Sequence, residues 1–284
     1  EPCSFSAWLA VRHGSKKGIP VIVTSWQNIY KTFPWPFSWF EAACFRGSAC
    51  IAAGGVTTRE VLQQKGYRRP IPLTPLTVDL ERFHPLERAS LPAPWRTEDF
   101  VVGYCGRLVK EKGIEVLLRA SRRLSFPHRV WLNGCGDHEP ELRREIACLK
   151  LAERVTIMNS LPGELNHFYN ALDVLAAPSL SLPNWREQFN RTIGEAQACR
   201  VPVVGADSGE IPHTLGAAAR GGLLFPEGDD RALAEQLTRL HDRPVEARQL
   251  AERGQEHCRA HFSHKTVARQ LLGLYNEVLG GGKQ

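Results

Sequence analysis

Two glutamates, Glu187 and Glu195, lie eight residues apart around a predicted helix start. A rise of about 1.5 Å per helical residue would place their backbones roughly 12 Å apart. That span suits a nucleotide whose ribose is joined through a diphosphate to a sugar. Glu195 could accept hydrogen bonds from ribose hydroxyls and Glu187 from sugar hydroxyls, while the helix N-terminus between them holds phosphate. The spacing alone is weak, because two glutamates eight residues apart occur by chance in many proteins.

A second group of chemically capable residues lies in the turn 103–113, which follows a predicted strand and precedes an amphipathic helix. A strand-to-helix turn presents free N–H groups and the positive end of the helix to an anion. Arg107 and Lys112 would add two positive charges at that mouth. This suits a diphosphate, whose negative charge grows as its bond to a sugar breaks. Taken by itself, a basic turn of this kind is more often a surface feature.

The elements that must position these residues alternate between strand and helix from Phe100 onward. Such alternation predicts a parallel sheet covered by helices, with ligands at the carboxyl ends of the strands. The expected strands are 101–104, 129–133, 155–158, 173–177, 202–205 and 223–225, and the last helices are 230–241, 246–261 and 264–279.

The region before Phe100 predicts a second, smaller α/β part. We expect a strand at 19–24, helices at 40–49 and 58–65, and a proline-rich connection over 74–96. The resulting division is a partial first domain with its linker over 1–90, a main domain over 91–262, and a last helix over 263–284 that crosses back to the first domain.

Composition excludes several function classes. The chain has 284 residues, 43% of them hydrophobic, and 36 Lys and Arg against 30 Asp and Glu. The basic residues are scattered, without a cluster interleaved with aromatics, so nucleic acid is not expected as a partner. The eight cysteines have no zinc-like spacing, and no run approaches the ~20 apolar residues that span a bilayer. We therefore expect a cytoplasmic protein with reduced thiols, with peripheral contact to the inner membrane face as an option.

Besides the two candidate groups, five further stretches are informative through their order along the chain. They are a linker-like stretch at 77–85, Pro-Ser at 178–179, Val-Pro-Val-Val at 201–204, Ser-Gly-Glu-Ile-Pro at 208–212 and Gly-Leu-Leu-Phe-Pro at 222–226. Together with 103–113 and 187–196, they resemble in order and spacing the retaining GT-B glycosyltransferases of family 4. The resemblance covers nearly the whole chain.

This resemblance implies a fold and a set of roles. The fold is α/β, of GT-B type, with two Rossmann-like parallel-sheet domains of which the N-terminal one is truncated. Arg107 and Lys112 would bind the donor diphosphate, Glu195 the ribose and Glu187 the transferred sugar, with Glu187, Arg107 and Lys112 taking part in catalysis. The full donor-binding set would be Gly106, Arg107, Lys112, Glu187, Gln188, Phe189, Asn190 and Glu195.

The resemblance also implies the reaction and its partners. A sugar would move with retention of configuration from a nucleoside diphosphate sugar to a glycan or lipid-linked acceptor. No metal ion and no cofactor would take part, and the chain agrees in having no D-x-D motif.

Three departures from the family pattern bear on this assignment. Asn190 replaces a usual Gly, and asparagine tolerates a left-handed backbone. Arg200 replaces another Gly, at a cost of about 1 kcal/mol if its backbone is left-handed. Trp26 stands where many members have a His, which leaves Gln27 or Asn28 as hydrogen-bonding candidates on the acceptor side.

The chain lacks the Gly-rich strand and loop that usually open the acceptor domain, so we expect a fragment. The main alternative function is a non-catalytic nucleotide-sugar-binding module, or an inactive fragment, that kept the donor pocket without a complete acceptor half. A nucleotide-sugar epimerase of the same fold fits less well, because the paired glutamates and the stretch 208–212 look like those of transferases.

Overall fold

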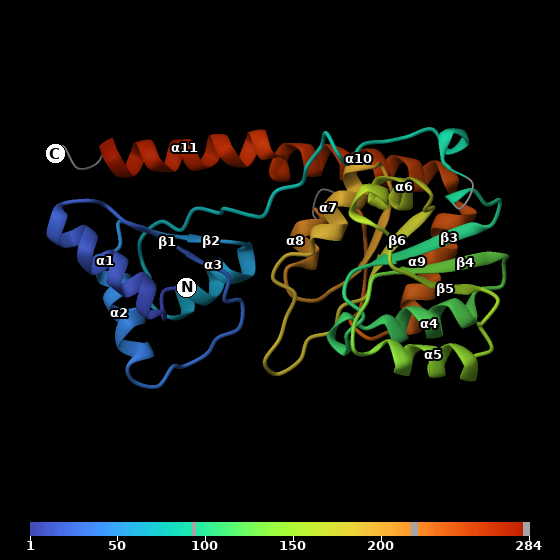
Figure 1. The fold of residues 1–284 in the computed structure, drawn as a ribbon, viewed down its shortest axis with the longest axis horizontal. Helices are drawn as coiled ribbons and strands as arrows, with labels where there is room; N and C mark the ends of the chain where they lie inside the picture. Colours follow the sequence, from blue (N-terminus) through green and yellow to red (C-terminus); the bar gives the residue numbers. More distant parts are fainter. Residues whose placement is uncertain (93–94, 217–220, 281–284) are drawn as a thin grey trace. The chain divides into compact units, whose positions relative to one another are not determined.

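The computed structural model describes residues 1–92, 95–216 and 221–280. The chain divides into two compact units (Figure 1). Unit 1 comprises Glu1–Leu76 and Lys265–Gln284, and unit 2 comprises Thr77–His264. Residues 281–284, at the end of the last predicted helix, lie outside the described part of the chain.

Unit 2 is built on a six-stranded parallel sheet, as the sequence predicts. Its strands occur in the order β5-β4-β3-β6-β7-β8. Their bounds are β3 (Phe100–Cys105), β4 (His128–Asn133), β5 (Val155–Met158), β6 (Val174–Ala177), β7 (Val203–Ala206) and β8 (Leu223–Phe225). All six predicted strands are confirmed to within about two residues, a usual uncertainty for element ends.

Helices follow most of these strands along the chain. They are α4 (Ile114–Arg123), α5 (Glu139–Cys148), α6 (Leu165–Asn170), α7 (Arg191–Ala198), α8 (Ile211–Leu215), α9 (Asp230–Asp242) and α10 (Pro244–Phe262). Short 3₁₀ turns occur at Arg88–Ser90, Lys110–Lys112 and Pro162–Glu164. Figure 1 shows helices on both faces of the sheet, which explains why most residues of its strands are apolar.

Residues from Thr77 onward belong to unit 2, whereas we expected the first domain and its linker to extend to about residue 90. The reason is that this segment is held to unit 2 by buried contacts. The N–H of Val78 donates to the carbonyl of Phe262, at 2.7 Å. The side chain of Val78 is 1% exposed and packs against Gly194 of α7. Residues of the proline-rich stretch therefore pack into the core of unit 2, so this stretch is not a free linker.

Unit 1 contains α1 (Phe5–Lys17), β1 (Ile22–Ser25), α2 (Phe37–Gly47), β2 (Cys50–Ala53) and α3 (Val56–Gln64). It also contains α11 (His264–Gly280) from Lys265 onward. Strands β1 and β2 pair in parallel, and Leu73 adds a single parallel bridge to Ala53. Leu274 and Val278 of α11 pack against Cys50 and Ala52 of β2.

Candidate functional site

A glycine allows the basic turn after β3 to lie close to the loop after β6. Gly113 has a φ of +62°, and a Cβ built on it would lie 2.1 Å from the carbonyl oxygen of Pro178. Only glycine combines the left-handed backbone with so close an approach. Lys112 and Ser179, the neighbours of these two residues, are thereby brought to the same place at the carboxyl ends of the strands.

The carboxylate of Glu187 is the point where these loops meet. Its Oε2 accepts hydrogen bonds from Lys112 Nζ at 2.5 Å, Ser179 Oγ at 2.9 Å and Asn190 Nδ2 at 3.3 Å. The residue is 5% exposed. Three donors from three separate segments therefore fix one carboxylate oxygen, and the ammonium of Lys112 compensates its charge.

A further loop supports the backbone of Glu187. The N–H of Glu210 donates to the carbonyl of Glu187 at 2.9 Å. Gly209 has a φ of +54°, and a Cβ on it would lie 2.5 Å from the same carbonyl oxygen. The stretch 208–212, which is one of those that carry the family resemblance, thus holds the backbone of Glu187 in place.

Glu195 lies inside α7, apart from the cluster around Glu187. It is 8% exposed, and its Oε2 accepts a hydrogen bond from the hydroxyl of Tyr169 at 2.7 Å. Burial raises the pKa of Glu195 above its ordinary value, while the Tyr169 hydrogen bond lowers it. A buried carboxylate with one neutral donor retains acceptor capacity for hydroxyl groups.

The remaining predicted donor residues are less closely gathered. The side chain of Arg107 is 66% exposed and pairs with Glu111 at 3.5 Å. Gly106 has a φ of +147° and donates its N–H to the carbonyl of Asn133 at 3.0 Å. Gln188 is exposed, and the ring of Phe189 packs edge-on against Phe262. The structure therefore joins Lys112, Glu187 and Asn190 directly and leaves Arg107 at the rim.

Two of the three departures have clear structural outcomes. Asn190 has a φ of −91°, so the left-handed backbone that we considered there is absent. It precedes α7, and its side chain contacts both Glu187 and Thr192. Arg200 has a φ of +59°, which is the strained conformation that we anticipated, and its guanidinium donates to Gln255 Oε1.

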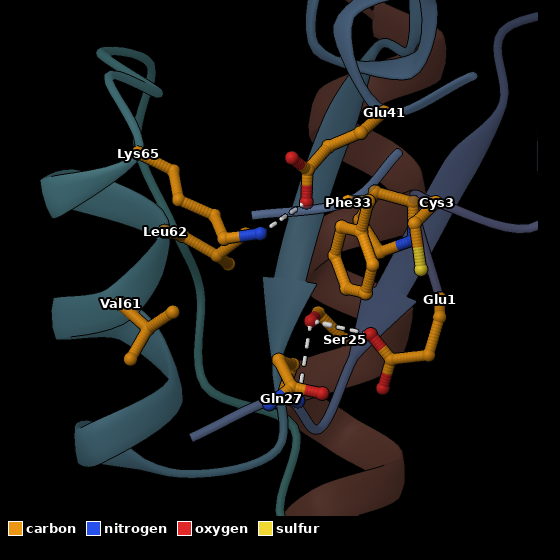
Figure 2. A pocket seen from close by; sticks show the side chains of 10 residues that line it. Glu1, Cys3, Ser25, Gln27, Phe33, Glu41, Val61, Leu62 and Lys65 are labelled. Carbon is orange, nitrogen blue, oxygen red and sulfur yellow. Dashed lines mark hydrogen bonds and ion pairs between the residues drawn. The ribbon is translucent and has the colours of Figure 1, made fainter. Parts of the chain in front are cut away.

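The acceptor-side candidates follow β1 in unit 1. The N–H of Trp26 donates to the carboxylate of Glu1 at 2.7 Å, and its ring lies against Gly54. Asn28 is 4% exposed. Gln27 lines the small pocket of Figure 2, where the ion pair between Lys65 and Glu41 lies nearby.

That pocket holds about 10 Å³, roughly what one water molecule needs. It is too small for a sugar. The acceptor-side roles of Trp26, Gln27 and Asn28 stay predictions.

Sequence reasoning missed two residues that touch the site. Tyr169, on α6, reaches Glu195, and the ring of Trp185 lies over Lys112 Nζ at 5.2 Å from the ring centroid. Tyr169 carries no spacing signal, because its contact is made across the fold. Trp185 contacts Lys112 across the fold as well, and its only sequence signal is its position two residues before Glu187.

Within residues 1–92, 95–216 and 221–280, no group of three or more His, Cys, Asp or Glu side chains could hold a metal ion. None of the described helices has the length and apolarity needed to cross a bilayer. The eight cysteines all lie in described residues and are free thiols.

The sequence and the fold of this chain are both similar to those of known glycosyltransferases. The sequence profile of the family described as "Glycosyl transferases group 1" matches residues 99–243, just over half of the chain. Similar curated proteins include a D-inositol 3-phosphate glycosyltransferase of Saccharomonospora viridis, 32% identical over 217 residues, covering 71% of this chain and 49% of that protein. Another is the lipopolysaccharide core biosynthesis mannosyltransferase LpcC of Rhizobium leguminosarum, 27% identical, covering 72% of this chain and 59% of that protein.

Solved structures agree on the fold. Anabaena HepE in complex with UDP is similar with a TM-score of 0.84 and 19% identity, over 96% of this chain and 76% of that one. Sucrose-phosphate synthase of Thermosynechococcus elongatus is similar with a TM-score of 0.76 and 24% identity, over 96% and 72%. The expected α/β fold of GT-B type is confirmed.

The chain spans about half the length of the first of these curated relatives. Its matched region nevertheless contains the whole cluster around Glu187 together with Glu195 and the basic turn. With the family profile, the curated relatives and the fold in agreement, this chain belongs to the group 1 glycosyltransferases.

Proposed function

We propose that unit 2 binds a nucleoside diphosphate sugar and that the protein transfers this sugar with retention of configuration, without a metal ion. The observation that carries the proposal is the carboxylate of Glu187, fixed by Lys112, Ser179 and Asn190 at the carboxyl ends of the parallel strands. Ligands of open α/β sheets bind at that edge. Glu187 is there assigned to the sugar hydroxyls.

The other donor contacts follow from the same arrangement. Lys112 is assigned to the diphosphate, where its ammonium would stabilise the negative charge that develops on the leaving group. Arg107 at the rim adds a second positive charge. Glu195 is assigned to the ribose, since its buried carboxylate keeps acceptor capacity beyond the bond to Tyr169. The solved complexes of HepE with UDP and with UDP-glucose, a protein of the same fold, make this donor class reasonable.

For the acceptor we propose a glycan or a lipid-linked sugar, on the cytoplasmic side of the cell. Unit 1 supports the lipid-linked option through its surface. Phe5, Trp35 and Trp39 are 56%, 82% and 46% exposed, and the exposed Lys16 and Lys17 end α1. Exposed aromatic and basic side chains are the kinds that favour contact with an anionic membrane surface.

The donor proposal is tested by thermal shift against UDP-, GDP- and ADP-sugars in the presence of EDTA. One of the three is expected to raise the melting temperature, because a ligand that binds only the folded state stabilises it by mass action. Lys112→Ala should abolish most of the shift. Lys110→Ala is the matched control, since Lys110 is exposed in the same turn. No shift with any donor would overturn the proposal, and a shift that requires a divalent cation would overturn metal independence.

Transfer is tested separately from binding. Sugar release to a broad mixture of glycan and lipid-linked acceptors should exceed hydrolysis of the donor, and the product should keep the anomeric configuration of the donor. Donor binding without transfer to any of these acceptors would favour the alternative of a non-catalytic binding module.

A further inference from the structure

A small hairpin precedes Glu187 in unit 2. Leu182 and Trp185 form an antiparallel bridge, with N–H to carbonyl distances of 2.8 Å and 3.2 Å in the two directions. Its tip, Pro183 and Asn184, is exposed. The paired backbone fixes the side on which the ring of Trp185 projects.

The base of this hairpin is tied to two other loops at the same edge of the sheet. The N–H of Leu180 donates to the carbonyl of Glu111 at 2.8 Å. The backbone N–H and the hydroxyl of Ser181 both donate to the carboxylate of Glu227, at 2.5 Å and 2.8 Å. The hydroxyl of Ser181 also lies 2.9 Å from that of Ser208. The hairpin is therefore a supported element.

The ring of Trp185 meets the ammonium of Lys112. The Nζ atom lies 5.2 Å from the ring centroid, and the side chain of Lys112 is only 15% exposed. A cation within about 6 Å of an aromatic face is attracted to it, more strongly where water is excluded. The ring of Trp185 can stay against the ammonium of Lys112 while that ammonium binds a ligand. The carboxylate of Glu187, in contrast, competes with an anionic ligand for the same ammonium.

Lys112 and Glu187 are assigned to different parts of the donor, yet here they are bound to each other at 2.5 Å. In the exchange that we consider, an arriving diphosphate draws the ammonium away from Glu187, which frees that carboxylate for sugar hydroxyls. The ring of Trp185 does not compete, because it offers no anionic acceptor. We propose that Trp185 is a positioning residue that keeps the ammonium of Lys112 in the site during this exchange. The inference rests on the proposed function of unit 2.

A first experiment needs no ligand. Acetic anhydride labels lysine amines, and mass spectrometry gives the rate at Lys112, with the exposed Lys110 as internal reference. Trp185→Leu should raise the relative labelling of Lys112 several-fold, and Trp185→Phe should stay close to wild type because it keeps an aromatic face. Equal relative rates in wild type and Trp185→Leu would overturn the inference, whether or not any nucleotide binds.

A second experiment measures coupling by calorimetry with whichever of UDP, GDP and ADP binds wild type. Trp185→Leu should weaken binding of that nucleotide about fivefold, a change of about 1 kcal/mol, because an ammonium without the ring beside it must be ordered when the diphosphate binds. In a Lys112→Ala background the same change should have almost no effect, because the ring acts through the lysine. An equal loss in both backgrounds would overturn the positioning role. If wild type binds none of UDP, GDP and ADP, the proposed function fails and the role of Trp185 in the exchange fails with it, and the labelling result then decides only whether the ring holds the ammonium of Lys112.

Discussion

Replacing Gly113 by alanine should damage the site through the backbone. Its φ of +62° disfavours any residue with a Cβ, at about 1–2 kcal/mol. The new methyl group would also lie 2.1 Å from the carbonyl oxygen of Pro178. No side-chain rotation can relieve that overlap, and overpacking of this kind costs about 1–3 kcal/mol.

The expected net destabilisation is about 1–4.5 kcal/mol, after subtracting the ~0.5–1 kcal/mol by which losing a glycine restricts the unfolded chain. For a unit of this size, that lowers the melting temperature by roughly 2–18 °C. Differential scanning calorimetry measures the shift. Donor affinity should fall as well, because Lys112 and Ser179 flank the two residues that are forced apart.

Gly228→Ala provides the matched control. Gly228 has a φ of +79°, but a Cβ there would meet only a side-chain carbon of Leu180 at 3.8 Å. This variant carries the backbone cost without the overlap, so it should lose about 1 kcal/mol or less. If Gly113→Ala were no worse than Gly228→Ala, the close approach of the two loops would not be a rigid feature of unit 2.

Three further predictions concern the assigned donor contacts. Lys112→Ala should weaken nucleoside diphosphate binding by about 1.5–3 kcal/mol, and Arg107→Ala should weaken it by less because the side chain of Arg107 is solvent-exposed. Unchanged affinity of both variants in calorimetry would refute the diphosphate assignment. Glu187→Ala should spare binding of the free nucleoside diphosphate and reduce turnover of the sugar donor, so equal losses in Glu187→Ala and Glu195→Ala would refute the division between sugar and ribose. The raised pKa of Glu195 means that its contribution to stability is present below the ordinary glutamate value of 4.5 and is lost as the pH rises through the raised folded-state pKa. Glu195→Gln should therefore gain stability relative to wild type as the pH rises above about 4.5, and it should bind nucleotide more weakly. Melting curves with a pH-independent difference would contradict this.

Most of unit 2 could be predicted from the sequence, because buried parallel strands leave a strong local signal. Short apolar runs such as 101–104 and 202–205, each bounded by turn residues, are typical of strands covered on both faces. The limits of the linker could not be predicted. Val78 and Phe83 lie among prolines and polar residues, and only the tertiary structure buries them against α7 and α6.

The candidate site was predictable where chemistry and order combine, as for Lys112 and Glu187. Their direct bond was not, since two residues 75 positions apart carry no local sign of pairing. The same holds for Tyr169 and Glu195, which are joined across two helices. At Asn190 the residue type suggested a left-handed backbone, but its place before α7 allows an ordinary conformation. Side-chain contacts across the sheet edge are set by packing, which a single sequence does not reveal.

The burial of Glu195 has a consequence for how copies of this gene diverge. Under the proposed ribose role, selection for nucleotide binding maintains at Glu195 a carboxylate that is 8% exposed, where the fold would be better served by a neutral side chain of similar size. Once that selection is relaxed, glutamine can replace Glu195 because its amide oxygen still accepts the hydrogen bond of Tyr169, whereas an apolar residue would remove the acceptor of that buried hydroxyl. Gly113, in contrast, is required by the backbone whether or not the protein binds a ligand. A descendant that keeps Gly113 and has lost Glu195 would therefore be a folded protein that has abandoned its donor.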